Sequence, residues 1–383
     1  MQSSRRSEVD PFIVMDVMES ARQAEATGRS IIHMEVGQPG TPAPKGAREA
    51  LARALESDPL GYTVALGLPE LRLGIARLYK DWYGLAINPD RVVVTTGSSA
   101  AFQLAFIALF DANDRVAIGD PGYPSYRNIL KALALEPVSI ASLAENRFQP
   151  SPDQVLAAKN ISGLLVASPA NPTGTMLDRQ ALKGLIDACH SRGAAFISDE
   201  IYHGIQYGAP AVSALEISDD VVVINSFSKY FSMTGWRIGW MVVPENLIRV
   251  IERLAQNLFI CPPHASQIAA LGAMDCQTEL AANMAVYRNN RDLMLQGLPK
   301  AGFSRFAPPD GAFYIYADVS ELTDDSRILA AEILDQAGVA VTPGLDFDPL
   351  RGKHGLRFSY AQSSADIAEG LLRLQDFMQR RRG

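Results

Sequence analysis

The sequence VVVINSFSKYFSMTGWRIGW, residues 221–240, joins an apolar run to a group of polar and charged side chains. The run VVVIN shows no polar alternation, which is typical of a strand buried on both faces of a parallel sheet. Ser226, Ser228 and Lys229 follow it directly, and Arg237 lies between two tryptophans. Because ligands bind beyond the carboxyl ends of parallel strands, this stretch predicts both the fold class and the position of a binding site.

Similar apolar runs alternate with helical patterns through the middle of the chain. The runs are RVVVTT, RVAIG, GLLVAS, AAFISD and VVVINS, and amphipathic stretches such as DRQALKGLIDACHSRG separate most of them. This alternation predicts an α/β fold in which helices cover both faces of a mostly parallel sheet. We expect this large domain to span residues 41–280.

The pattern changes from about Pro244 onward. Two long helices are expected at residues 246–274 and 281–298, followed by the strands GAFYIYADV and GLRFSYA and two further helices. These elements predict a smaller α+β domain made of residues 281–383 and completed by residues 1–40. No internal repeat or low-complexity linker separates the two parts, so we expect them to pack closely.

The composition is that of an ordinary globular protein: 383 residues, of which 48% are hydrophobic and 20% charged. The 35 basic and 42 acidic residues give a net charge of −7, and the basic ones are scattered, so no nucleic-acid or membrane surface is expected. The three cysteines lack the spacing of a disulfide framework, and the five histidines lack that of a metal site. Because neither a leader pattern nor a membrane span is visible, we expect a cytoplasmic protein.

Polar residues also follow three other predicted strands. They are Ser98 and Ser99 at the start of a helix, Asn171 in the segment PANPTG, and Asp199 with Tyr202 after AAFIS. Taken singly, these features are usually a helix N-cap, a turn and a strand-end cap. Because the carboxyl ends of parallel strands meet at one edge of the sheet, we expect these side chains to converge there.

A ligand that used the whole group would be anionic at one end, aromatic in the middle and electrophilic at a carbonyl. The free N–H groups near Ser98 and Ser99 favour a phosphate, and Arg237 adds a charged contact. A protonated ring nitrogen requires a carboxylate, Asp199, and an aldehyde requires an amine, Lys229. The asparagine and tyrosine of the group can donate to a phenolate oxygen. These requirements describe pyridoxal 5′-phosphate.

With this cofactor in view, the sequence resembles the class I/II aminotransferases of fold type I, the aspartate aminotransferase type. The segment SFSKYFSMTGWRIGW is similar to their signature S-x-S-K…G-x-R-x-G-[WY]. Further matches, in the same order and spacing, are EVGQPG, GYTVALGLPELR, TTGSSAAFQ, DPGYPSY, SPANPTG, SDEIY and GLRFSYA. The resemblance covers almost the whole chain and implies a pyridoxal-phosphate-dependent aminotransferase.

The resemblance also implies roles for individual residues. Lys229 is the residue whose amine binds the aldehyde of the cofactor, and Tyr123 stacks on the ring face. The phosphate is implied to contact Ser98, Ser99, Ser226 and Arg237. The Asn171–Pro172 peptide is expected to be cis, so that the turn aims the asparagine at the ring oxygen.

On the substrate side, the resemblance implies that Arg357 binds the α-carboxylate of the amino acid and that Gly37 lies beside it, with Asn171 nearby. It further implies a homodimer whose active sites lie at the subunit boundary, with Tyr62 reaching the phosphate of the neighbouring subunit. The substrates are then an amino acid and a 2-oxo acid. No segment of the sequence identifies the side chain of the amino acid.

The charges suggest a mechanism. Desolvation and the nearby Arg237 should lower the pKa of Lys229, because both disfavour the ammonium form. A neutral lysine can attack an aldehyde and later move a proton as base and acid. With Asp199 and Tyr202 as the other catalytic candidates, the expected reaction is ping-pong transfer of an amino group from an L-amino acid to a 2-oxo acid.

Other interpretations fit parts of the same sequence. β-Lyases, decarboxylases, racemases and synthases share this cofactor site, and only substrate-side residues and kinetics separate them from a transaminase. Ser226 and Lys229 also match the S-x-x-K motif of serine acyl-enzymes, but the chain has no Lys-Thr-Gly or Ser-Asp-Asn. A transcription regulator with an aminotransferase-like half would need an added DNA-binding module, for which no residues are left. His203 is expected to be a packing residue.

Overall fold

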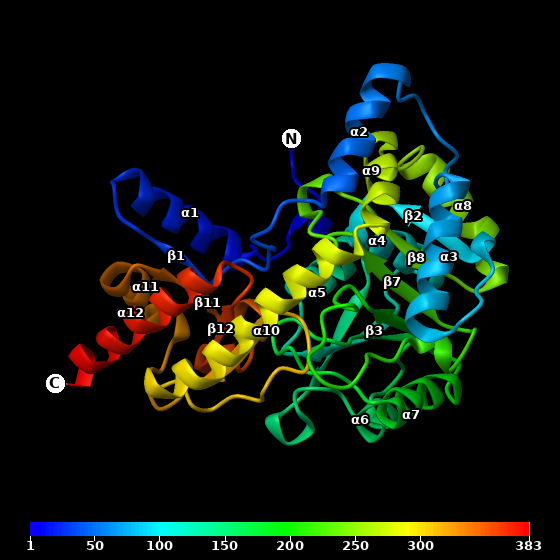
Figure 1. The fold of residues 1–383 in the computed structure, drawn as a ribbon. Coiled ribbons are helices and arrows are strands. Elements are labelled where there is room, and N and C mark those ends of the chain that lie inside the picture. Colours follow the sequence, from blue (N-terminus) through cyan, green and yellow to red (C-terminus); the bar gives the residue numbers. More distant parts are fainter. Residues whose placement is uncertain (383) are drawn as a thin grey trace.

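The computed structural model describes residues 1–382 and contains a large seven-stranded sheet (Figure 1). The strand order is β2-β8-β7-β6-β5-β3-β4. The neighbours from β7 to β4 run parallel, and β8 runs antiparallel to both β2 and β7. The strands are β2 (Val92–Thr95), β3 (Arg115–Asp120), β4 (Glu136–Ala141), β5 (Gly163–Ala167), β6 (Ala195–Asp199), β7 (Val222–Ser226) and β8 (Gly239–Val242). This mostly parallel α/β sheet confirms the predicted fold class.

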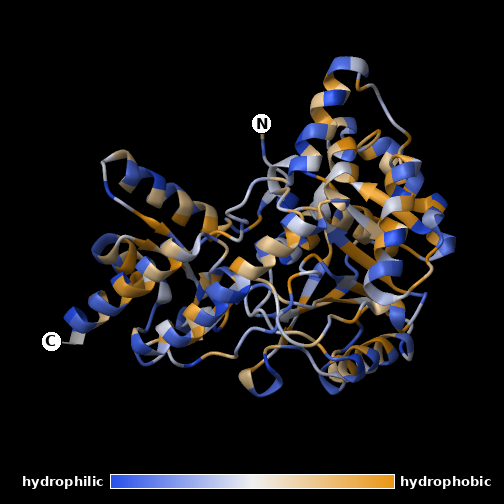
Figure 2. Cartoon of the chain, in the orientation of Figure 1, coloured by the Kyte–Doolittle hydropathy of each residue, from blue (hydrophilic) through white to orange (hydrophobic). Residues whose placement is uncertain are grey.

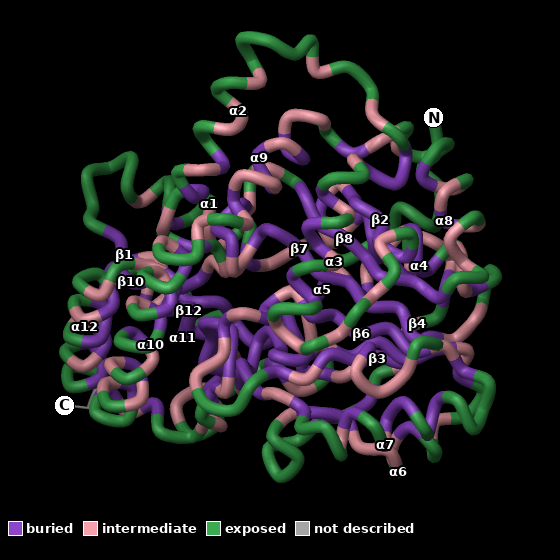
Figure 3. Tube along the Cα trace, turned by 45° about the vertical axis from the view of Figure 1, so that its right-hand side comes forward, coloured by how far each residue is buried: buried purple, intermediate pink, exposed green. Residues whose placement is uncertain are grey.

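Both faces of the sheet are buried, which explains the unbroken apolar runs (Figures 2 and 3). In β7, Val223 packs in one core cluster and Ile224 in the other, because successive side chains point to opposite faces. One face is covered by α2 (Lys45–Ser57), α3 (Pro69–Tyr83), α6 (Pro152–Ala157), α7 (Arg179–His190) and α9 (His264–Met274). The other is covered by α4 (Gly97–Leu109), α5 (Pro124–Ala132) and α8 (Glu245–Leu258).

A smaller part combines two short sheets with four helices. The sheet β11-β12-β9 is antiparallel, and β1 pairs in parallel with β10. These strands are β1 (Ile32–His33), β9 (Tyr314–Asp318), β10 (Val339–Ala340), β11 (Thr342–Pro343) and β12 (Gly355–Ser359). The helices are α1 (Ile13–Ala26), α10 (Gln277–Lys300), α11 (Ser326–Ala337) and α12 (Ser364–Arg382).

The N-terminal segment packs with this C-terminal part. Ile32 pairs with Val339 across the two strands, and Met34 lies in the same apolar cluster as Val339. In Figure 1, α1 lies on the same side of the molecule as α11 and α12. The domain boundaries at residues 40/41 and 280/281 stay a prediction.

Two details differ from the sequence prediction. The single helix expected at residues 246–274 is two helices, α8 and α9, because Pro262 and Pro263 between them lack backbone N–H donors. The strands β4 and β8 were not predicted. Strand β4 lies at the edge of the sheet and is mostly exposed or half-buried, so its apolar signal is weak. Strand β8 has only four residues, and the first two of them, Gly239 and Trp240, belong to the motif.

Short 3-10 turns connect many of these elements. They are η1 (Arg5–Ser7), η2 (Pro89–Arg91), η3 (Ala144–Asn146), η4 (Ala214–Glu216), η5 (Thr234–Trp236), η6 (Gly344–Asp346) and η7 (Gly352–His354). Among residues 1–382, none of the helices combines the length and apolar composition that a membrane span requires.

Candidate active site

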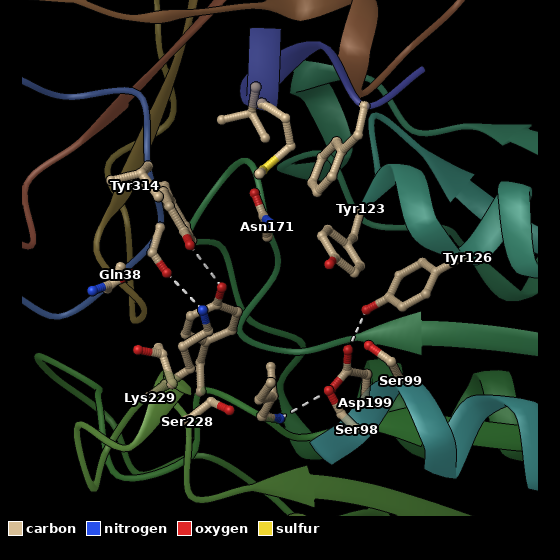
Figure 4. A pocket seen from close by; sticks show the side chains of 18 of the residues that line it. Gln38, Ser98, Ser99, Tyr123, Tyr126, Asn171, Asp199, Ser228, Lys229 and Tyr314 are labelled. Carbon is tan, nitrogen blue, oxygen red and sulfur yellow. Dashed lines mark hydrogen bonds between the residues drawn. The ribbon is translucent and has the colours of Figure 1, made fainter. Parts of the chain in front are cut away.

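A cavity lies beyond the carboxyl ends of the parallel strands and is lined by residues from both parts of the chain (Figure 4). It brings together most of the predicted site residues, whose side chains or backbone line it: Gly37, Ser98, Ser99, Tyr123, Asn171, Asp199, Tyr202, Lys229, Arg237 and Arg357. The residues that follow strands of the large sheet share this place because those strands end at the same edge. Gly37 and Arg357 reach the cavity from the smaller part of the chain.

Asp199 ends β6 with its carboxylate in the cavity and is only 3% exposed. It accepts hydrogen bonds from the Tyr126 hydroxyl and, at 3.0 Å, from the Ile201 backbone N–H. Burial raises the pKa of Asp199 to about 6, although these two hydrogen bonds and Lys229 act in the opposite direction. A buried carboxylate of this kind is stabilised by a cation, so a protonated ring nitrogen fits the site.

Lys229 follows β7 and faces the cavity, where its Nζ donates a 2.6 Å hydrogen bond to the Gly37 carbonyl. Desolvation, together with Arg357 and Arg237, lowers the pKa of Lys229 to about 8, and Asp199 acts in the opposite direction. The direction is the predicted one, with Arg357 as an additional cause. A lysine with this pKa has a substantial neutral fraction near neutral pH, as a nucleophilic amine requires.

The start of α4 and the Arg237 side chain form a corner of the cavity that suits an anion. Gly97 has φ +73°, and a Cβ there would lie 2.4 Å from Nη2 of Arg237, so the guanidinium packs against the first turn. At Gly239 a Cβ would lie 3.1 Å from the Ser98 backbone nitrogen. The two glycines therefore allow a close approach, and the helix N-terminus with the arginine suits a phosphate.

Ser226 differs from its predicted position. Its side chain is 1% exposed and does not line the cavity. The hydroxyl lies 2.8 Å from the Ser228 hydroxyl and 2.9 Å from the Ile238 carbonyl. Ser228 lines the cavity instead, and the role of Ser226 at the phosphate stays a prediction.

Tyr62 lies outside the cavity. Its side chain is 84% exposed, beside a surface hollow lined by Ile260, Cys261 and neighbouring prolines. Within one chain it therefore does not join the other predicted residues.

Arg357 projects from β12 into the cavity and is 3% exposed. Its guanidinium is held between the rings of Tyr314 and Phe347, at 4.6 and 4.7 Å from their centroids. It donates to Asn171 Oδ1 at 2.9 Å and to Thr342 Oγ1 at 3.2 Å, while Nε has no hydrogen-bond partner. A buried donor without a partner suits a carboxylate ligand. The Asn171–Pro172 peptide is cis, as predicted.

Several cavity residues were missed at the sequence level. Tyr126, which contacts Asp199, lies in DPGYPSY, and Tyr314 lies in the predicted strand GAFYIYADV. Their motifs were recognised, but the direction of each ring depends on tertiary packing. The other missed lining residues include Phe12, Val14, Met15 and Met18.

The missed apolar residues come from α1 and the residue before it. Their helical spacing was visible, but nothing in the sequence indicates that this helix would cover a site formed by the distant large sheet. His203, expected to be a packing residue, is 1% exposed and does not line the cavity. Among residues 1–382, no group of three or more His, Cys, Asp or Glu residues is placed to hold a metal ion.

The comparisons with known proteins agree with this geometry. The family model for aminotransferase class I and II matches residues 29–374. The valine–pyruvate aminotransferase of Mycobacterium tuberculosis is 48% identical over 379 residues, 97% of each chain. A candidate aminotransferase structure from Silicibacter pomeroyi is 66% identical with a TM-score of 0.95, covering 99% of this chain and 100% of that one. The aspartate aminotransferase of Thermus thermophilus with maleate is 30% identical, with a TM-score of 0.92 and coverage of 98% and 100%.

The proteins named here are all described as aminotransferases, which favours amino-group transfer over the other reactions that share this cofactor site. The corner at α4, the buried Asp199 and the amine of Lys229 fit the phosphate, the ring nitrogen and the aldehyde of pyridoxal 5′-phosphate. The chain therefore belongs to the class I and II aminotransferases, enzymes that use pyridoxal 5′-phosphate to move an amino group between an amino acid and a 2-oxo acid.

Proposed function

We propose that this chain transfers the amino group of an amino acid with an apolar side chain to a 2-oxo acid by a ping-pong mechanism. The observation that carries the proposal is a single cavity that holds an amine, a carboxylate, an anion-binding corner and a second arginine under an apolar wall. The residue roles below, the homodimer and a cytoplasmic location belong to the same proposal.

When bound, pyridoxal 5′-phosphate supplies an aldehyde that takes up amino groups and a ring that accepts electrons from the Cα–H bond of the substrate. Ser98, Ser99 and Arg237 would hold its phosphate at the start of α4. Asp199 would keep the ring nitrogen protonated, because an opposite charge at short range stabilises a cation in a poorly solvated pocket. Tyr123 would cover one face of the ring.

Lys229 would bind the aldehyde and, after the amino group of the substrate displaces it, move a proton at the substrate Cα. Its pKa of about 8 suits a group that acts both as base and as acid near neutral pH. Tyr202 and Asn171 would donate hydrogen bonds to the ring oxygen. Gly37 would hold the free amine inside the cavity, because its carbonyl accepts from Nζ.

Arg357 would bind the α-carboxylate of the substrate through its planar guanidinium, whose Nε is free to donate. Stacking between two aromatic rings fixes the plane of the guanidinium, so little orientational freedom is lost on binding. The Asn171 side chain, which accepts from Nη1, holds the arginine on the side of the ring oxygen.

The substrate side chain would face the wall formed by Phe12, Val14, Met15 and Met18. A dicarboxylate substrate would need a further cation. Among the described residues, the basic side chains that line the cavity are Lys229 and two arginines that already have a proposed role. The wall therefore suits an aliphatic substrate, and the 48% identical relative is named for valine and pyruvate.

The homodimer is supported by exposed apolar side chains near Tyr62. Tyr62, Val64, Leu258 and Ile260 are each at least half exposed, and the first and last of them border the same hollow. Exposed apolar patches of this kind mark interaction sites. A second copy of the chain covering this surface would bring Tyr62 to the phosphate of its neighbour.

The test is a panel of amino donors with the cofactor-loaded enzyme, following the absorbance of the bound cofactor in a single turnover. Valine, leucine and alanine should each react faster than aspartate and glutamate at equal concentration. Met18→Lys places a cation in the apolar wall and should raise the rate with aspartate relative to the rate with valine. Faster turnover of aspartate by the wild-type enzyme would contradict the proposed substrate class, and no donor-dependent change at all would contradict the proposed reaction.

A further inference from the structure

Tyr314 is a buried cavity residue that the sequence motifs do not assign to the site. It is the first residue of β9 and is 1% exposed. Figure 4 shows its hydroxyl pointing toward the group around Lys229.

The hydroxyl and the ring of Tyr314 contact three residues with proposed roles. The hydroxyl oxygen lies 2.8 Å from that of Tyr202. The ring lies under the guanidinium of Arg357, 4.6 Å from the centroid to Cζ. A Cβ on Gly37 would lie 1.8 Å from the Tyr314 hydroxyl, so the backbone that accepts from Lys229 packs directly against it. Tyr314 thus touches the ring-oxygen, carboxylate and amine subsites together.

The two tyrosines share one hydrogen bond, so only one of them donates. Burial raises the pKa of both hydroxyls, that of Tyr314 to about 12 and that of Tyr202 well above its ordinary value. Arg357 opposes the effect of burial on the pKa of both hydroxyls, but its guanidinium stacks directly on the ring of Tyr314, 4.6 Å from the centroid, so this contact favours Tyr314 as the stronger acid of the pair. The stronger acid is the better donor, which leaves the proton of Tyr202 free for another acceptor.

We propose that Tyr314 is a positioning residue for Tyr202: its hydroxyl donates to the Tyr202 oxygen, so that the Tyr202 O–H points at the ring oxygen of the cofactor. The contact between the Tyr314 ring and Arg357 fixes the position of the Tyr314 hydroxyl relative to the carboxylate subsite. The inference rests on the proposed function, because it requires pyridoxal 5′-phosphate bound at Lys229.

The effect is measurable without activity. Without Tyr314 as donor, the Tyr202 hydroxyl is less well oriented and donates more weakly, so more negative charge remains on the ring oxygen. This charge lies next to the nitrogen that joins Lys229 to the cofactor, and negative charge raises the pKa of a neighbouring cationic nitrogen. Tyr314→Phe should therefore raise that pKa, read from the pH-dependent absorbance of the bound cofactor.

The experiment uses three test variants: Tyr314→Phe, Tyr202→Phe and the double variant that carries both changes. Tyr316→Phe is the control. Tyr316 lies on the same strand, is buried and does not line the cavity, so its variant controls for the loss of a buried hydroxyl. In Tyr314→Phe, we expect the pKa of the nitrogen that joins Lys229 to the cofactor to rise by at least about half a unit. The kcat should fall about tenfold, as for a lost hydrogen bond. The KM for the amino acid should stay within about twofold of the wild-type value. The double variant should shift the pKa no further than Tyr202→Phe alone.

The outcomes separate the two proposals. An unchanged pKa in folded, cofactor-loaded Tyr314→Phe overturns the positioning role, as does a double variant whose shifts simply add. An equal shift in Tyr316→Phe also overturns it, because the effect is then general to the strand. If the wild-type protein forms no absorbing adduct with the cofactor, the proposed function itself fails.

Discussion

At the scale of the residue, the site is defined by charges held away from bulk water. Asp199 is almost fully buried and its pKa is raised to about 6 by burial, with Tyr126 as its hydrogen-bond donor. Such a carboxylate is costly unless a cation approaches it. The ring nitrogen is the cation that the proposed function supplies, and the benefit grows as the ring accepts electrons in the transition state.

Asp199→Asn therefore should keep the cofactor, through the phosphate corner and Lys229, but slow the half-reaction at least about a hundredfold, roughly 2.7 kcal/mol. Single-turnover rates on folded, cofactor-loaded protein measure this. Glu200→Gln is the matched control, because Glu200 is buried beside Asp199 but hydrogen bonds to Ser213 and the Ala214 backbone instead of lining the cavity. A rate within about threefold of wild type would show that Asp199 is only a strand-end cap.

Lys229 gives a pH prediction. Its folded-state pKa, lowered to about 8 from 10.5, means that the nucleophilic neutral amine dominates only above that pH. The rate at which cofactor-free protein takes up pyridoxal 5′-phosphate should rise as pH increases through about 8 and then level off. Stopped-flow absorbance measures the profile. A rate that continues to rise to pH 10, as for an ordinary lysine, would contradict the lowered pKa.

At the scale of the element, α1 connects the site to the small part of the chain. The two N–H groups at the start of α1, those of Ile13 and Val14, donate to the Asp346 carboxylate at 3.0 and 3.2 Å. Asp346 is 3% exposed and belongs to η6, so a distant residue caps the helix. This cap holds the apolar wall over the cavity.

Asp346→Ala should destabilise α1 by about 1 kcal/mol, the usual cost of a lost N-cap. Because α1 forms the proposed side-chain wall, KM for valine should rise several-fold while the absorbance of the bound cofactor stays unchanged. Asp325→Ala is the control, since Asp325 caps α11 through the Arg327 N–H and does not line the cavity. Equal KM changes in the two variants would mean that α1 does not contact the substrate.

The sequence alone predicts some of these elements and their polar ends, but not the directions of all the side chains in the site. The strands β5, β6 and β7 and the polar residues at their ends were predictable, because buried parallel strands carry unbroken apolar runs and end at one edge. Tyr126 and Tyr314 were not, since the directions of their rings are set by packing between segments far apart in sequence. The position of Ser226 behind Ser228 likewise depends on the local path of the chain after β7.

At the scale of the whole molecule, the proposal requires two chains. In a single chain Tyr62 is 84% exposed and outside the cavity. Mixing Tyr62→Ala with Lys229→Ala tests whether it acts across the dimer, because each heterodimer would contain one complete site. In an equal mixture with random pairing, half of the dimers are heterodimers, so about a quarter of all sites should be active. Dimeric mixtures with no recovery, or a monomeric wild-type protein in light scattering, would contradict the shared site.

The proposed function depends above all on Lys229 carrying the cofactor in this cavity. The most direct measurement is borohydride reduction of the cofactor-loaded protein, followed by peptide mapping. We expect one reduced pyridoxyl group, on Lys229, and none in Lys229→Ala, although that variant keeps the phosphate and ring contacts. A reduced pyridoxyl group on any other lysine of the wild-type protein would contradict it.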